Sequence, residues 1–181
     1  MALQPVPVPV PADDPADRQA ADDLRRRAMI VCELYTAISF FHLILLCCGV
    51  GYWWSLLLLG GAAFTGVTGM FHFTSMQALE MSHCIFAPLP AVHDLRVSSI
   101  CITAAGCLTC VAYVAAAVAR TYPAGGTATT KNDVAVAGTA VSLAYAVTGV
   151  FGAIVASQMT GPCARLHAMR CPCVPALAHE T

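Results

Sequence analysis

The stretch of sequence that decides the fold runs from Leu34 to Leu79 and reads LYTAISFFHLILLCCGVGYWWSLLLLGGAAFTGVTGMFHFTSMQAL. Its 46 residues contain no Asp, Glu, Lys or Arg. A bilayer core needs roughly 20 apolar helical residues for each crossing, so this stretch is long enough for two passes. The segment Gly-Val-Gly-Tyr at 49–52 favours a tight turn between them. We therefore predict a first pass at about 28–50 and a second at about 53–73.

Two further stretches without charged residues follow, and they are 23 and 31 residues long, at 97–119 and 134–164. Each is long enough for one pass, which places the third at about 97–119 and the fourth at about 134–157. A soluble protein would have to cover these apolar helices with polar surface, and the sequence supplies none. The prediction is an all-α membrane protein, a four-transmembrane-helix bundle whose membrane domain covers 28–157.

The composition of the whole chain agrees with a membrane protein. Of its 181 residues, 58% are hydrophobic and only 10% are charged, whereas roughly a quarter are charged in ordinary soluble domains. The net charge of −1 excludes a nucleic-acid partner held by a basic field. The expected partners are therefore the lipid bilayer and other membrane proteins.

The positions of Lys and Arg predict the orientation, because these residues are in excess on the cytoplasmic side of membranes. The first 27 residues have no early basic segment, so we expect an uncleaved anchor and not a signal peptide. Both termini are predicted to be cytoplasmic, in the plasma membrane or an endomembrane. Seven basic residues fall on one side and two on the other: Arg18, Arg25, Arg26, Arg27, Arg96, Arg165 and Arg170 against Arg120 and Lys131.

The segments outside the passes are short. Residues 1–27 form a Pro-rich and acidic N-terminal region that we expect to be disordered, with a polyproline II spacer at 5–11 and a short helix leading into the first pass. In the inner loop, Pro88 and Pro90 are predicted to break any helix. The outer loop has no cysteine and no glycosylation sequon, which excludes a large ectodomain. The tail, 158–181, is rich in cysteine.

The chain has ten cysteines, and six of them lie in the predicted helices, where packing explains them. For Cys163, Cys171 and Cys173 in the tail we favour S-palmitoylation, which is typical of juxtamembrane cysteines beside basic residues. A metal site is the alternative, because Cys163, His167 and Cys171 are spaced i, i+4, i+8 and share a helix face. The inner-loop residues His83 and Cys84 would then complete the set. Unmodified cysteines are the third interpretation.

Two ionisable residues, Glu33 and His42, lie inside the first pass, where such residues are candidates for function. Counting from the turn places Glu33 within one helical turn of His72, so the two are predicted to form an intramembrane polar pair. This pair is either proton-responsive or a satisfied contact at the interface, and we favour the contact. His42 lies deeper, with no second histidine at its depth to ligate haem. We predict no cofactor, no metal and no catalytic residue.

Small residues recur on the predicted helices, and they allow membrane helices to approach closely. In the second pass they repeat every four residues, and in the fourth they form an almost unbroken stripe with larger apolar residues on the opposite face. The stripes serve either the packing of one four-helix bundle or a homo-oligomer. The helix-packing candidates are Gly61, Gly69, Gly138, Ser142, Ala146, Gly149 and Ala153.

Three local motifs are similar to those of the membrane-spanning 4-domains family. They are Trp53-Trp54 followed by Gly60-Gly61, Ser98-Ser99-Ile100 followed by Ala104-Ala105-Gly106, and Cys163 soon after the fourth pass. The chain departs from the family in its short outer loop without paired cysteines. The resemblance implies a non-enzymatic membrane organiser, often oligomeric, that associates with receptors or modulates ion flux. It implies no catalytic residue.

These observations favour a non-enzymatic tetraspan interaction protein, an adaptor or organiser of membrane receptors or complexes. One alternative is a small oligomeric channel or transporter whose pathway forms between subunits. Another is an accessory subunit of a larger membrane enzyme complex. The absence of charges in the helix interiors favours the first and the last of these functions.

Overall fold

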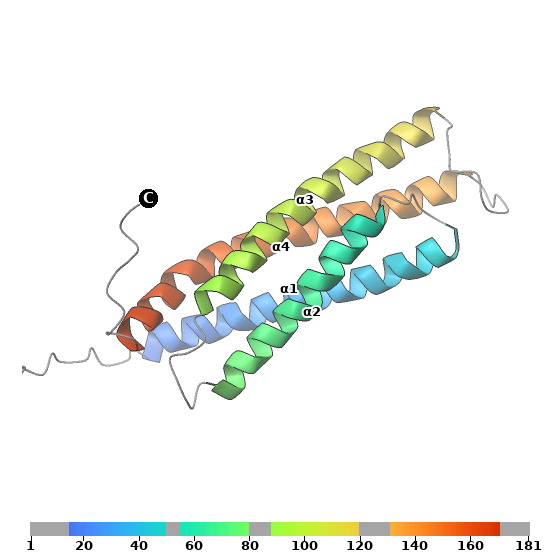
Figure 1. The fold of residues 1–181 in the computed structure, drawn as a ribbon. Helices are drawn as coiled ribbons and strands as arrows, with labels where there is room; N and C mark the ends of the chain where they lie inside the picture. The colour runs from blue at the N-terminus through green and yellow to red at the C-terminus, as the bar shows by residue number, and fades with distance from the viewer. Residues whose placement is uncertain (1–14, 50–54, 80–87, 120–130, 171–181) are drawn as a thin grey trace, which may run out of the picture.

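A computed structural model describes residues 15–49, 55–79, 88–119 and 131–170, and within these residues every regular element is an α-helix (Figure 1). Each of the four helices contains a segment long and apolar enough to cross a bilayer. These are the features of a multi-pass membrane protein, as the sequence predicted. The helices are α1 (Pro15–Cys47), α2 (Ser55–Leu79), α3 (Pro88–Ala119) and α4 (Lys131–Arg170), and their apolar segments are Asp22–Cys47, Ser55–Thr74, Ala91–Val118 and Val134–Gly161.

The helices are longer than the predicted passes. α1 begins at Pro15, so the predicted short helix is present and is continuous with the first pass. Pro88 and Pro90 lie in the first turn of α3, where a missing N–H costs nothing, and they start this helix instead of lying in a loop. α4 continues through Pro162 to Arg170, beyond the predicted end of the fourth pass.

α1 ends where the sequence predicted a turn. The amide of Cys48 donates to the carbonyl of Ile44 over 3.0 Å, and the amide of Gly49 donates to that of Leu46 over 3.0 Å. Gly49 has a φ of 78°, which glycine adopts without the steric cost that a side chain would add. The glycine therefore ends the helix at this position.

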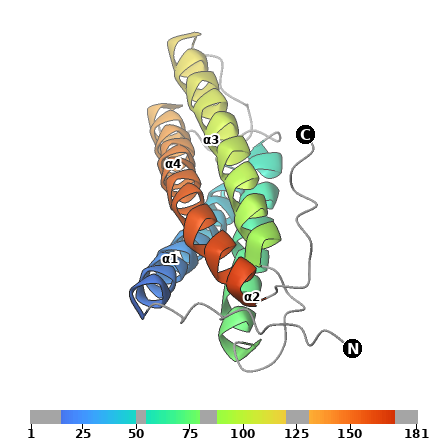
Figure 2. The ribbon, with the colours of Figure 1, turned by 90° about the vertical axis from the view of Figure 1, so that its left-hand side faces the viewer.

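The helices form a ring in which each packs against its neighbours in the sequence and α1 also packs against α4. The contact between α3 and α4 is the most extensive and that between α2 and α3 the least. Figure 2 shows α4 between α1 and α3. α1 begins and α4 ends at the same end of the bundle (Figure 1).

Glycines set the close approaches between helices. A Cβ on Gly149 would lie 2.8 Å from the carbonyl oxygen of Ser99, and one on Gly106 would lie 3.0 Å from the amide nitrogen of Ala146. On α2, a Cβ on Gly66 would lie 2.8 Å from the carbonyl oxygen of Cys32. The backbones of α3 and α4, and of α1 and α2, are therefore in contact where only hydrogen fits.

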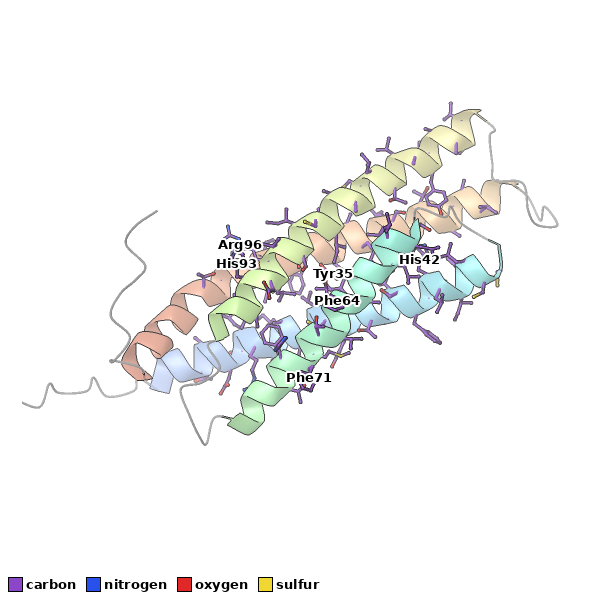
Figure 3. All side chains as sticks on the ribbon, in the orientation of Figure 1. Tyr35, His42, Phe64, Phe71, His93 and Arg96 are labelled. Atoms are coloured by element: carbon purple, nitrogen blue, oxygen red, sulfur yellow. The ribbon has the colours of Figure 1, made fainter. Side chains whose placement is uncertain are left out.

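Large apolar side chains cover the outside of the bundle. Phe64 and Phe71 lie on the outside of α2 (Figure 3) and are 72% and 70% exposed. Leu108 on α3 is 76% exposed. In water this surface would be a severe liability, whereas a bilayer solvates it. The interior instead holds two tyrosines, Tyr35 and Tyr145, that are completely buried.

Candidate functional site

Five of the buried polar residues in the interior of the bundle form hydrogen bonds between helices, and we call them the polar cluster. Three lie on one face of α1 at spacings of four and three residues, one lies on α3, and one on α4. All are at most 4% exposed. An apolar helix bundle that buries this many hydroxyl and imidazole groups must pair them with one another. The members are Tyr35, Ser39, His42, Ser99 and Tyr145.

Tyr145 is the centre of the first half of the polar cluster. Its hydroxyl donates to Ser39 Oγ over 3.2 Å and lies 3.4 Å from Nδ1 of His42. Because a hydroxyl carries one hydrogen, this donation leaves Tyr145 as the acceptor for His42, whose neutral ring then carries its proton on Nδ1. The two rings are tilted by 58° with centroids 5.6 Å apart. α4 is thereby joined to two successive turns of α1.

The second half of the polar cluster joins α1 to α3. The hydroxyl of Tyr35 donates to Ser99 Oγ over 3.1 Å. The carbonyl of Ser99 accepts a hydrogen bond of 2.8 Å from Thr103 Oγ1. A Cβ on Gly152 of α4 would meet both Ser99 on α3 and Val31 on α1. The hydrogen bond of Tyr35 thus lies where three helices meet.

Every member of the polar cluster has a hydrogen-bond partner within the cluster. Throughout the described part of the chain, every buried side-chain nitrogen and oxygen has a hydrogen-bond partner. The imidazole of His42 is bonded to a tyrosine and not to a serine, so it is not placed to activate Ser39 as a nucleophile. This arrangement fixes the rotation of α1 against α3 and α4.

The structure does not bring Glu33 and His72 together. Both side chains are exposed, and between these two described residues there is no ion pair or hydrogen bond. His42 is buried, and its hydrogen-bond partner is Tyr145 of α4.

Sequence reasoning missed four of the five residues of the polar cluster. The available signal was the spacing of Tyr35, Ser39 and His42, which places three polar side chains on one face of an otherwise apolar helix. A face of this kind in a membrane helix must find partners inside the protein. The partners on α3 and α4 had no comparable signal.

The candidate packing residues divide into two groups. Gly138 faces the ring of Tyr113, Gly149 faces Thr103 and Ser99, and Ser142 and Ala146 are buried beside Gly106. The stripe on α4 therefore packs on α3 within the bundle, with Ala153 partly buried at its edge. On α2, Gly69 faces the sulfur of Cys32, whereas Gly61 is exposed and a Cβ there would have nothing within 4 Å.

The cysteines proposed for lipidation in the tail lie mostly outside the described residues. Cys163 lies near the end of α4, while Cys171 and Cys173 lie outside the described residues, as do His83 and Cys84 of the alternative metal site. Among the residues whose side chains the structure describes, no group of three His, Cys, Asp or Glu residues could hold a metal ion.

Comparison with known proteins adds no relative. No protein-family model, curated protein or solved structure matches this chain. The function is therefore inferred from the chemistry of the interior and of the outer surface.

Proposed function

We propose that this chain is a non-enzymatic tetraspan membrane protein that organises other membrane proteins, and that it contacts them through the outer face of α1. The observation that carries the proposal is the carboxylate of Glu33. This side chain is exposed on α1, within the apolar segment Asp22–Cys47, and it has no hydrogen bond or ion pair among the described residues.

The surroundings of Glu33 make its exposure costly. It shares a helical face with Ile30 and Phe40, which are 44% and 67% exposed and have the character of lipid-facing side chains. Glu33 lies fourteen positions before Cys47 at the end of α1, which is about 21 Å of helix at 1.5 Å per residue. When Cys47 lies at one boundary of a hydrocarbon core about 30 Å thick, Glu33 is still inside that core. An ionisable group at such a depth needs a partner.

A second membrane helix with a basic or hydrogen-bond-donating side chain fits this requirement. Such contacts stabilise helix association in bilayers, where the hydrophobic effect between helices is absent. The interior of the bundle supports an interaction role in a different way. Tyr35 and Tyr145 fill the space between α1, α3 and α4, and their hydroxyls are bonded to neighbouring helices. A pathway through one subunit would have to break these bonds.

We also propose that both termini are cytoplasmic. Seven of the nine basic residues lie on the side of the N-terminus, the inner loop and the tail. α1 begins and α4 ends at the same end of the bundle, which agrees with an even number of passes (Figure 1).

Photo-crosslinking in intact membranes tests the proposed contact. A photoreactive amino acid at Ala37, one turn from Glu33, should capture a protein, whereas the same amino acid at Phe64 on α2 should capture lipid. Glu33→Gln keeps the shape of the side chain and removes its charge, so it should weaken the protein adduct from Ala37. Asp23→Asn, ten positions earlier on the same helix and at the start of the apolar segment Asp22–Cys47, should not. Equal protein adducts at both positions, or no effect of Glu33→Gln, would contradict the proposal.

The identity of the captured protein separates the related functions. A second copy of this chain would indicate a homo-oligomer and would favour a channel or transporter formed between subunits. A larger subunit in fixed stoichiometry would indicate an accessory role in a membrane enzyme complex. Several different membrane proteins would indicate an organiser.

A further inference from the structure

A groove of about 660 Å³ lies on the outer surface between α3 and α4. It is lined by Ile100 and the small residue Ala104 on α3, and by Val150, Ile154 and the small residue Ala153 on α4. A smaller hollow of about 360 Å³ shares Thr103, Val150 and Ile154 with it and extends the groove along the helices. We call the two together the α3–α4 groove. Its length along two helices and its apolar walls match an extended hydrocarbon chain.

The α3–α4 groove has one polar end. Ser157 and Gln158 of α4 line it there, three to four residues before the apolar segment ends at Gly161. On α3, Arg96 lies one turn before Ile100 on the same helical face, and its side chain is exposed. Figure 3 shows Arg96 and His93 together on α3, pointing outward. Because α3 and α4 are antiparallel, these residues lie at the same boundary of the membrane.

The polar end can bind an anion. Arg96 and Gln158 have no hydrogen bond or ion pair among the described residues, so a guanidinium and an amide are available as donors. Ser157 donates its hydroxyl hydrogen to the carbonyl of Ala153 over 2.7 Å and offers only an acceptor. Asp94 pairs with His93 at 3.9 Å and lies about 200° around α3 from Arg96, so it does not oppose an anion at the groove.

We propose that the α3–α4 groove binds one anionic phospholipid, with an acyl chain along the apolar walls and the phosphate at Arg96 and Gln158. Basic residues between membrane helices at the headgroup level recognise such lipids. The charge of Arg96 lies at one end of the apolar groove, as the phosphate lies at one end of the acyl chain in the lipid. This proposal is independent of the contact proposed at Glu33, which lies on α1.

Native mass spectrometry of the full chain in detergent tests the site. Phosphatidylglycerol and phosphatidylcholine with identical acyl chains are added separately, so that only the headgroup charge differs. We expect phosphatidylglycerol to bind more tightly, and Arg96→Gln to lower its affinity about fivefold while leaving phosphatidylcholine unchanged. Arg26→Gln removes another exposed charge, on α1, and should change neither affinity.

A second pair of variants tests the groove itself. Ala104→Phe fills it and should weaken both lipids, whereas Leu108→Phe alters a neighbouring exposed position of α3 outside the larger hollow and should not. All these positions are exposed, so the variants are expected to fold, and thermal melting verifies this. Equal binding of the two lipids, or unchanged binding in Arg96→Gln or Ala104→Phe, would overturn the proposal. A dimer that Ala104→Phe dissociates would overturn it in favour of a second copy of the chain in the groove.

Discussion

Tyr145 of α4 donates a hydrogen bond to Ser39 of α1 over 3.2 Å, and the two residues are 106 positions apart in the sequence. The bond joins the first and the last pass of the bundle. Both residues are buried, and the same hydroxyl also faces His42. Since neither partner has access to water, the loss of one hydroxyl leaves the other groups unsatisfied.

Tyr145→Phe should therefore destabilise the protein. The ring still fills its space, so the loss reports on the hydrogen bonds to Ser39 and His42 rather than on packing. We expect a decrease of about 0.5–1.5 kcal/mol in the free energy of unfolding, in line with hydrogen bonds between membrane helices. Reversible unfolding in mixed micelles measures this change. In a double-mutant cycle with Ser39→Ala the two effects should be less than additive; full additivity would show that the bond contributes nothing.

Two glycines on α2 should respond to alanine in opposite ways. A Cβ on Gly66 would lie 2.8 Å and 3.0 Å from backbone atoms of Cys32 and Thr36, so Gly66→Ala must separate α1 from α2. We expect it to cost about 1–3 kcal/mol. Gly61→Ala meets nothing within 4 Å and should be neutral or stabilising by up to about 1 kcal/mol through helix propensity. Thermal melting in detergent compares the two. If Gly61→Ala were the more damaging, Gly61 would pack against a second protein.

The sequence predicts the number and order of the passes because charged residues are excluded from three long stretches, and it predicts the end of α1 from the glycine at position 49. It does not predict the polar cluster. The apolar residues of α2, α3 and α4 are spread around each helix, so no amphipathic pattern shows which side faces the interior. The pairing of Tyr35 with Ser99 depends on that rotation.

The sequence also does not predict that α4 continues through Pro162 to Arg170. Proline removes one backbone hydrogen bond, and in a helix interior this is expected to end the helix. Pro162 lies one residue beyond the apolar segment that ends at Gly161. The carbonyl that Pro162 leaves free belongs to Gln158, close to the end of that segment, where water and headgroups can satisfy it, so the helix continues.

The orientation can be tested with epitope tags. Tags at the N-terminus and at the C-terminus should be protected from antibody in intact cells and should become accessible after permeabilisation of the plasma membrane. A tag between Gly125 and Gly126 should be accessible without it when the protein reaches the cell surface. For protein in an internal organelle, selective permeabilisation of the plasma membrane alone should expose the two terminal tags. A C-terminal tag on the opposite side from the N-terminal tag would require an odd number of passes.

The tail cysteines should carry thioester-linked fatty acids. Hydroxylamine releases such acyl groups, and a maleimide polymer on the freed thiols then shifts the mass on a gel. We expect this shift in the wild-type protein and its loss when Cys163, Cys171 and Cys173 are all changed to serine. Cys47→Ser and Cys48→Ser, at the far end of α1, should leave it unchanged. A shift that persists in the triple variant would assign the modification to other cysteines. Stoichiometric zinc that Cys171→Ser removes would favour the metal interpretation.

Gly149→Leu tests whether the small-residue stripe of α4 serves the bundle or an oligomer. Any side chain at this position would collide with Thr103 and with the carbonyl of Ser99 on α3, both at the most extensive helix contact of the fold. We expect a loss of about 1–3 kcal/mol in the stability of the monomer, because the backbones must separate. Val147→Leu changes a residue that is 61% exposed on the opposite face of α4 and should have little effect. Thermal stability and oligomer size are measured together in detergent. Loss of an oligomer with an equally stable monomer would move the stripe to a subunit interface, and no change in either would refute its role in packing.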